Sequence, residues 1–132
     1  MRNIIRKRHA FTLLFLVAGT FLYAKPIEKR QICKAALSLV MGVEPQNIRY
    51  DRESDGVFYL SYTLEEKGEP YRYRCKIEPN RVIWGSEMGR WRTKEEDALI
   101  TYTLHAESVT IYERFNDEEG ISDQATFTSS AL

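Results

Sequence analysis

The spacing of apolar residues changes once along the chain, near residue 45. Before that point they recur at intervals of three and four, as on one face of an α-helix. These residues are Ile32, Cys33, Ala36, Leu37, Val40 and Met41. Pro26 suits a first turn and Gly42 suits an end. The pattern predicts one amphipathic helix, which is too short to be stable alone and must pack on another element.

After residue 45, apolar and polar residues alternate, which is typical of half-buried β-strands. The predicted strands span residues 47–53, 57–64, 70–78, 81–86, 99–105, 109–116 and 122–128. Short turn sequences separate most of them, and residues 87–98 form the longest irregular connection. We therefore expect an α+β fold, with one N-terminal helix packed on a curved antiparallel β-meander of about six or seven strands. The alternative is a small closed β-barrel with the helix at its mouth.

Residue counts across the predicted turns give a register for the strands. The expected pairs are Tyr62 with Tyr71, Phe58 with Cys75, Tyr59 with Arg74, and Ser61 with Arg72. A two-residue turn at Pro79-Asn80 pairs Trp84 with Cys75, whereas a bulge there would shift this pairing by one residue. The register separates an apolar side from a basic, aromatic one.

The first 24 residues have the pattern of a secretory signal. Residues 1–9 carry four basic residues and no acid, and residues 10–24 are apolar and uncharged. The apolar run is shorter than the roughly 18 residues typical of a membrane-spanning helix, although an uncleaved anchor is the alternative. We expect cleavage after Ala24, leaving residues 25–132 as a single periplasmic or secreted domain with no stable membrane span.

Loss of the signal changes the charge. The whole chain balances 19 basic and 19 acidic residues, whereas the expected mature chain keeps 15 basic and 19 acidic residues, a net charge of −4. Nucleic-acid binding depends chiefly on phosphate neutralisation, so this charge argues against nucleic acid as a partner.

The two cysteines are expected to form a disulfide. Cys33 lies on the apolar stripe of the helix, and Cys75 lies on the strand face that the helix should cover. An exported small domain favours oxidation of such a pair, and two buried free thiols are the alternative. No CxxC redox motif or CxxCH haem motif is present.

Few residues suit catalysis, and the sequence predicts neither a cofactor nor a metal site. His105 is the only histidine of the expected mature chain, and it lies at a predicted turn. Glu113 and Asp123 are weak catalytic candidates, because alternation places Glu113 on the inner face and a tight turn places Asp123 opposite it. The alternative is that this pair meets water or the arginines of residues 89–92.

A basic–aromatic surface is the stronger candidate site. It comprises Tyr59, Arg72, Arg74 and Lys76 on the polar side of one hairpin, together with Arg90, Trp91 and Arg92 of the GRWR sequence. Arg74 is expected to stack on Tyr59, and Trp91 to provide a flat anchor beside arginine donors. Alternatively, Trp91 closes the end of the core while the arginines pair with Glu95, Glu96 or Asp97.

Several short motifs resemble those of a group of small, exported, uncharacterised bacterial proteins, mainly proteobacterial. The motifs are CKAA at 33–36, YRCKI at 73–77, NRVIWG at 80–85, GRWR at 89–92, ITY at 100–102 and VTIYER at 109–114. The resemblance implies one helix and a β-meander, and it implies no activity, cofactor or site.

The sequence favours an exported binding protein over an enzyme. Its expected partner is an envelope or secreted protein, as for an inhibitor or immunity protein, or an anionic envelope polymer. The alternative is a small hydrolase or lyase that acts in the envelope through Glu113 and Asp123.

Overall fold

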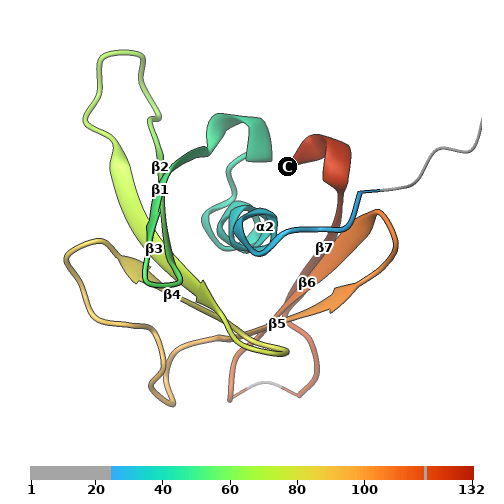
Figure 1. Ribbon diagram of the computed structural model, residues 1–132. Helices are drawn as coiled ribbons and strands as arrows, with labels where there is room; N and C mark the ends of the chain where they lie inside the picture. The colour runs from blue at the N-terminus through green and yellow to red at the C-terminus, as the bar shows by residue number, and fades with distance from the viewer. Residues whose placement is uncertain (1–24, 118) are drawn as a thin grey trace, which may run out of the picture.

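The computed structural model describes residues 25–117 and 119–132, so the predicted signal segment, residues 1–24, lies outside the described residues. The described part contains the helix α2 (Lys29–Met41) and seven strands, which Figure 1 labels. The strands are β1 (Arg49–Ser54), β2 (Val57–Tyr62), β3 (Tyr71–Ile77), β4 (Val82–Ser86), β5 (Leu99–Leu104), β6 (Ser108–Arg114) and β7 (Asp123–Thr128). Two short 3-10 helices, Pro45–Asn47 and Ser129–Ala131, complete it.

The predicted helix is confirmed, and its ends have local causes. At the start, the Glu28 backbone N–H donates to Oε1 of Gln31 at 2.9 Å, which satisfies a group that the helix leaves without a partner. At the end, Gly42 adopts a left-handed conformation with φ of 66°, which glycine tolerates best. The buried side chains of α2 include Ile32, Cys33 and Leu37 from the predicted apolar stripe.

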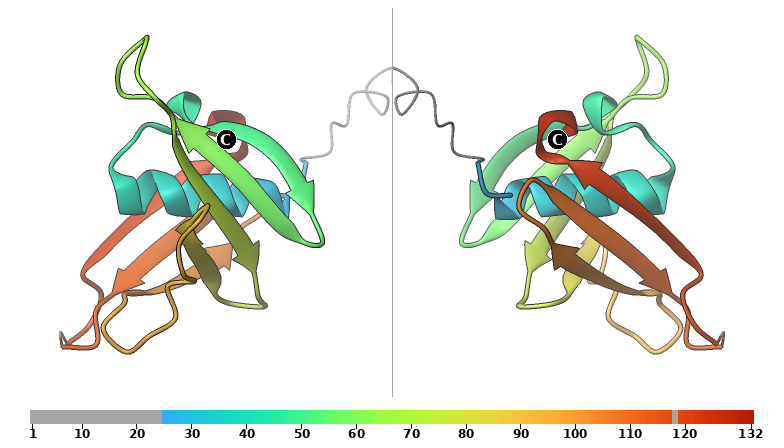
Figure 2. Two further views of the ribbon diagram at one scale, coloured as in Figure 1. Left: turned by 90° about the vertical axis from the view of Figure 1, so that its left-hand side faces the viewer. Right: turned by 90° about the vertical axis from the view of Figure 1, so that its right-hand side faces the viewer.

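The strands form two antiparallel sheets rather than one meander, and the closed-barrel alternative is wrong. One sheet has the order β1-β2-β3-β4 and the other β5-β6-β7. The connection 87–98 leaves the sheet after β4, and within the described ranges only an isolated bridge, Arg81 with Thr101, pairs across this boundary. Figure 1 shows the sheets diverging from this boundary with α2 between them, and Figure 2 shows α2 crossing their strands.

The predicted registers are confirmed in both sheets. In the first sheet, Phe58 pairs with Cys75 and Tyr62 with Tyr71. Trp84 pairs with Cys75 as well, so no bulge displaces the β3–β4 hairpin. A bulge occurs instead in β1, where the pairing shifts between Tyr50 and Arg52.

The core lies between α2 and the inner faces of both sheets. Leu37 from the helix, Leu60 from the first sheet, and Val109 and Ile111 from the second are almost fully buried. The expected disulfide is present, because Cys33 and Cys75 are bonded with their Cα atoms 5.9 Å apart. The bond ties α2 to β3 of the first sheet. No helix within the described ranges is long and apolar enough to span a membrane.

Candidate functional site

Cations and aromatic rings gather on the outer face of the first sheet, opposite the side that α2 covers. We call this surface the basic face. Its residues are Arg49 and Arg52 from β1, Tyr59 from β2, Arg72, Arg74 and Lys76 from β3, and Trp91 from the connection 87–98. The basic face thus contains the four residues that were predicted for the hairpin, and Trp91 lies beside them on the same surface.

The bulge in β1 explains why Arg49 and Arg52 were missing from the predicted site. Strict alternation would place two residues that are three apart on opposite faces. The extra residue, Asp51, has no partner in the ladder, so Arg49 pairs with Ser61 and Arg52 with Tyr59 on the same face. A sequence pattern that assumes an uninterrupted strand cannot recover this pair of cations.

Two stacked contacts organise the basic face, and they differ from the expected one. Arg52, not Arg74, stacks on Tyr59, with its Cζ atom 3.7 Å from the ring centroid. Arg74 packs instead against Trp91 at 4.0 Å, and the Nζ atom of Lys76 lies 4.6 Å from the same ring. Arg74 does not contact Tyr59 as expected, because Arg52 lies on that ring and Trp91 brings a larger aromatic surface to the side of Arg74 that faces β4.

The connection 87–98 reaches the basic face because it folds back over β4. The Arg92 backbone N–H donates to the Trp84 carbonyl at 2.8 Å, beside Gly85. Gly85 is buried, and a Cβ atom there would overlap the carbonyl oxygen of Arg90. The absence of a side chain at residue 85 therefore permits this close approach. Nη2 of Arg74 completes the contact by donating to the Gly89 carbonyl at 2.6 Å.

Arg90 and Arg92 have a structural partner, as in the alternative interpretation of GRWR. Arg90 donates to both carboxylate oxygens of Asp97, at 2.6 and 2.9 Å, and Nη1 of Arg92 lies 3.6 Å from Asp97. Only 6% of the Asp97 side chain is exposed. The hydrogen bonds from Arg90 hold the pKa of Asp97 well below its usual range. This ion pair fixes the connection and thereby the position of Trp91.

Most cations of the basic face lack a carboxylate partner. Within the described residues, no carboxylate lies within 4.0 Å of the charged atoms of Arg52, Arg72, Arg74 or Lys76. For Arg49, the carboxylate contact is a long one, because its Nε atom lies 4.0 Å from Oδ1 of Asp51. The Nε atom of Arg74 is buried without a hydrogen-bond partner. The basic face therefore holds positive charge that the described protein does not neutralise.

Glu113 and Asp123 face each other across β6 and β7 as predicted. Burial, and then the charge of Asp123, raises the pKa of Glu113. Glu113 lines a hollow of about 340 Å³ together with Trp84 and Arg92, but Asp123 does not line it. The two carboxylates are thus paired across the strands, and this hollow is lined by only one of them.

We expect Glu113→Gln to stabilise the protein at neutral pH. The raised pKa means that the folded state disfavours the ionised carboxylate, so this cost is present at high pH and disappears as the pH falls and Glu113 is protonated. Cross-strand charge pairs are worth about 0.2–1 kcal/mol, and like charges directly opposite each other destabilise, so we expect a gain of about this size. Chemical unfolding should show a gain of this size at pH 7 that is lost below about pH 4. An equal gain at both pH values would show that the ionised Glu113 carboxylate is not the cause. Asp123→Asn should give a smaller gain, because it removes the opposing charge but leaves Glu113 buried.

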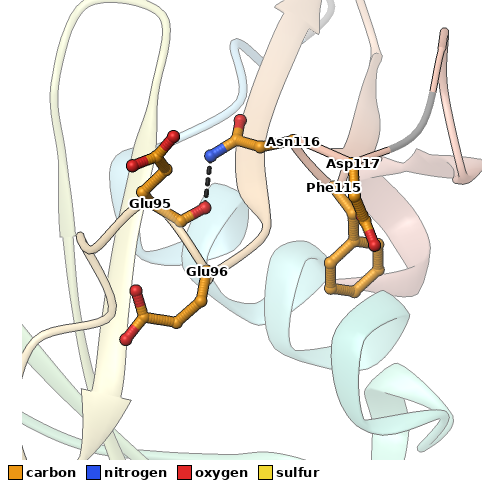
Figure 3. Close-up of a pocket in the computed structure, with 5 residues that line it drawn as sticks. All are labelled: Glu95, Glu96, Phe115, Asn116 and Asp117. Atoms are coloured by element: carbon orange, nitrogen blue, oxygen red, sulfur yellow. Dashed lines mark hydrogen bonds between the residues drawn. The ribbon is translucent and has the colours of Figure 1, made fainter.

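A second hollow lies between the connection 87–98 and the end of β6. It is lined by Glu95, Glu96, Phe115, Asn116 and Asp117, which Figure 3 shows. The Asn116 amide donates to the Glu95 carbonyl and links the two segments. The carboxylates of Glu95 and Glu96 point away from the Phe115 ring, as solvated groups of a connection do.

His105 is exposed at the predicted turn, with Nε2 3.3 Å from Oγ1 of Thr110.

Comparison with known proteins gives no family for this chain, because no family model, curated protein or solved structure matches it. The site must therefore be interpreted from its own geometry. Among the candidate surfaces of the described residues, the basic face combines the most unpaired charge with preorganised side chains.

Proposed function

We propose that this chain is an exported binding protein that uses the basic face to hold an anionic partner. The unpaired cations of Arg52, Arg72, Arg74 and Lys76 carry the proposal. They are concentrated on one sheet face, although the expected mature chain has a net charge of −4. Such local concentration favours an oppositely charged partner and speeds its association.

The disulfide supports the exported part of the proposal. Disulfides persist in oxidising compartments such as the periplasm and the extracellular space, and they are rare in the cytosol. The bond between Cys33 and Cys75 therefore agrees with the signal pattern of residues 1–24. A rigid domain with a fixed charged face suits an inhibitor-like or immunity-like protein.

The catalytic alternative has less support. Acid–base catalysis by this pair requires both carboxylates to come within hydrogen-bond reach of one substrate. Asp123 is exposed and lies outside the hollow that Glu113 lines. The geometry therefore favours binding over hydrolysis or elimination at this pair.

The proposal is tested by capture from envelope extract with the mature protein, residues 25–132. The variant Arg52→Ala with Arg72→Ala should lose the captured partner, because it removes two cations that no carboxylate neutralises. Its thermal midpoint should stay close to that of the parent, since exposed cations contribute little to stability. The matched control is Lys29→Ala with Lys94→Ala, which removes two cations outside the basic face. Equal capture by both variants would refute the proposal.

A further inference from the structure

The cations of the basic face are arranged in regular rows across and along the strands. Arg52, Tyr59 and Arg74 lie in one row across the strands, and Arg49, Ser61 and Arg72 lie in the next row. Adjacent strands are about 4.8 Å apart, so the arginines of β1 and β3 are separated by about 10 Å at the backbone. Along β3, cations recur at every second residue, about 7 Å apart. Repeated cations at fixed intervals match a partner with repeated anionic groups.

The stacked arginines are prepared to bind oxyanions. A guanidinium that lies flat on a ring loses side-chain freedom but keeps N–H donors along its edge. Arg52 is held in this way on Tyr59. Arg74 is held on Trp91 but keeps fewer donors for a ligand, because its Nη2 atom donates to the Gly89 carbonyl and its Nε atom is buried. Within the described residues Arg72 has no carboxylate within 4.0 Å, and it lies between Arg74 and the start of β3. These forks suit carboxylate or phosphate groups.

A shallow hollow continues the column of cations beyond the start of β3. It has a volume of about 470 Å³ and is lined by Pro70, Arg72, Ser86, Glu87, Met88 and Gly89. Met88 is 95% exposed at its rim. The cations Lys76, Arg74 and Arg72, which follow one another along the outer face of β3, therefore lead into this surface depression.

The composition of the basic face differs from that of a typical protein–protein interface. The centre of such an interface usually contains aromatic, apolar and arginine anchors and is depleted of lysine and acidic residues. Here Lys76 belongs to the row of cations, and Ile83, the apolar residue that pairs with it on this face, is only 6% exposed. The exposed apolar residue Met88 lies at the margin. A long polyanion fits this surface better than a compact protein does.

We propose that the basic face binds an acidic polysaccharide whose chain runs along β3, from Lys76 past Arg74 and Arg72 to the hollow beside Met88. Carboxylate or phosphate groups of the polymer meet the guanidinium forks. Trp91, whose ring contacts Arg74 and Lys76, is only half-buried, and its exposed part can pack against a sugar ring. This inference rests on the proposed function and specifies the class of its partner.

The test uses oligogalacturonates of defined length as the anionic probe and isothermal titration calorimetry as the measurement. Affinity should rise with length until the oligomer spans the column from Lys76 to Arg72, about 13 Å, and then level off. It should also weaken as salt concentration rises. Uncharged maltooligosaccharides should not bind, and poly-L-glutamate should bind more weakly because it has no sugar ring to pack on Trp91.

Single substitutions locate the site. Arg72→Ala should weaken oligogalacturonate binding by roughly 1.5- to fivefold, as expected for the loss of one exposed ionic contact, while Lys29→Ala should leave it unchanged. Trp91→Phe should weaken the binding of oligogalacturonate more than that of poly-L-glutamate. Affinity that is independent of length, or equal binding of both polymers, would overturn the polysaccharide assignment. If Arg52→Ala with Arg72→Ala abolishes capture of an acidic protein while no oligosaccharide binds, this inference is wrong and the proposed function stands.

Discussion

Reduction of the bond between Cys33 and Cys75 is expected to lower the free energy of unfolding by about 4 kcal/mol. The bond joins residues separated by 42 positions, and the chain-entropy relation gives this value for a loop of that length. Domains of this size are stable by roughly 5–15 kcal/mol, so the loss is a large part of the total. Urea unfolding with and without dithiothreitol measures it directly.

A variant separates the loss of the covalent link from the loss of packing. Both sulfur atoms are fully buried, so Cys33→Ala with Cys75→Ala removes the link and also leaves a small cavity. This variant should be no more stable than the reduced parent protein. An unchanged urea midpoint after verified reduction would show that the disulfide does not stabilise the fold.

Gly85→Ala is expected to destabilise the protein by about 1–3 kcal/mol, the usual cost of overpacking. The added methyl group would overlap the backbone carbonyl of Arg90, and a backbone group cannot rotate away as a flexible side chain can. The connection 87–98 would move outward and carry Trp91 away from Arg74 and Lys76. Chemical unfolding measures the stability, and tryptophan fluorescence reports the greater exposure of the ring to water.

Gly68→Ala is the matched control for this substitution. Its Cβ atom would lie 3.4 Å from the nearest atoms of Glu65, where a small adjustment suffices. It should therefore change stability little and leave tryptophan fluorescence as in the parent protein. If Gly85→Ala behaves in the same way, the connection is not held against β4 as described.

The pairing within each hairpin was predictable because the evidence for it is local. Alternation identifies the face of each residue, and the length of the turn sets the register. The pairs of Phe58 and Trp84 with Cys75 followed from these two facts, as did the pair of Glu113 with Asp123. The disulfide was then a consequence of two matching apolar faces.

The division into two sheets and the full basic face were not predictable in this way. The two sheets and the basic face both depend on places where the alternation of apolar and polar residues is interrupted. Prediction from periodicity assumes that each strand alternates without interruption. The bulge at Asp51 brings Arg52 beside Tyr59, and the fold of residues 87–98 over Gly85 brings Trp91 onto Arg74. Sequence alternation places the cations of β3 correctly, but it cannot show which ring each of them contacts.

The bulge in β1 has another consequence, which concerns the solubility of the protein. An exposed edge strand offers unpaired N–H and C=O groups to other chains and is a common starting point for aggregation. β1 is the outer strand of its sheet, all six of its residues are exposed, and four of them are charged. A bulged, charged strand of this kind pairs poorly with a second strand. The irregularity that assembles the basic face thus also protects the sheet edge against intermolecular strand addition.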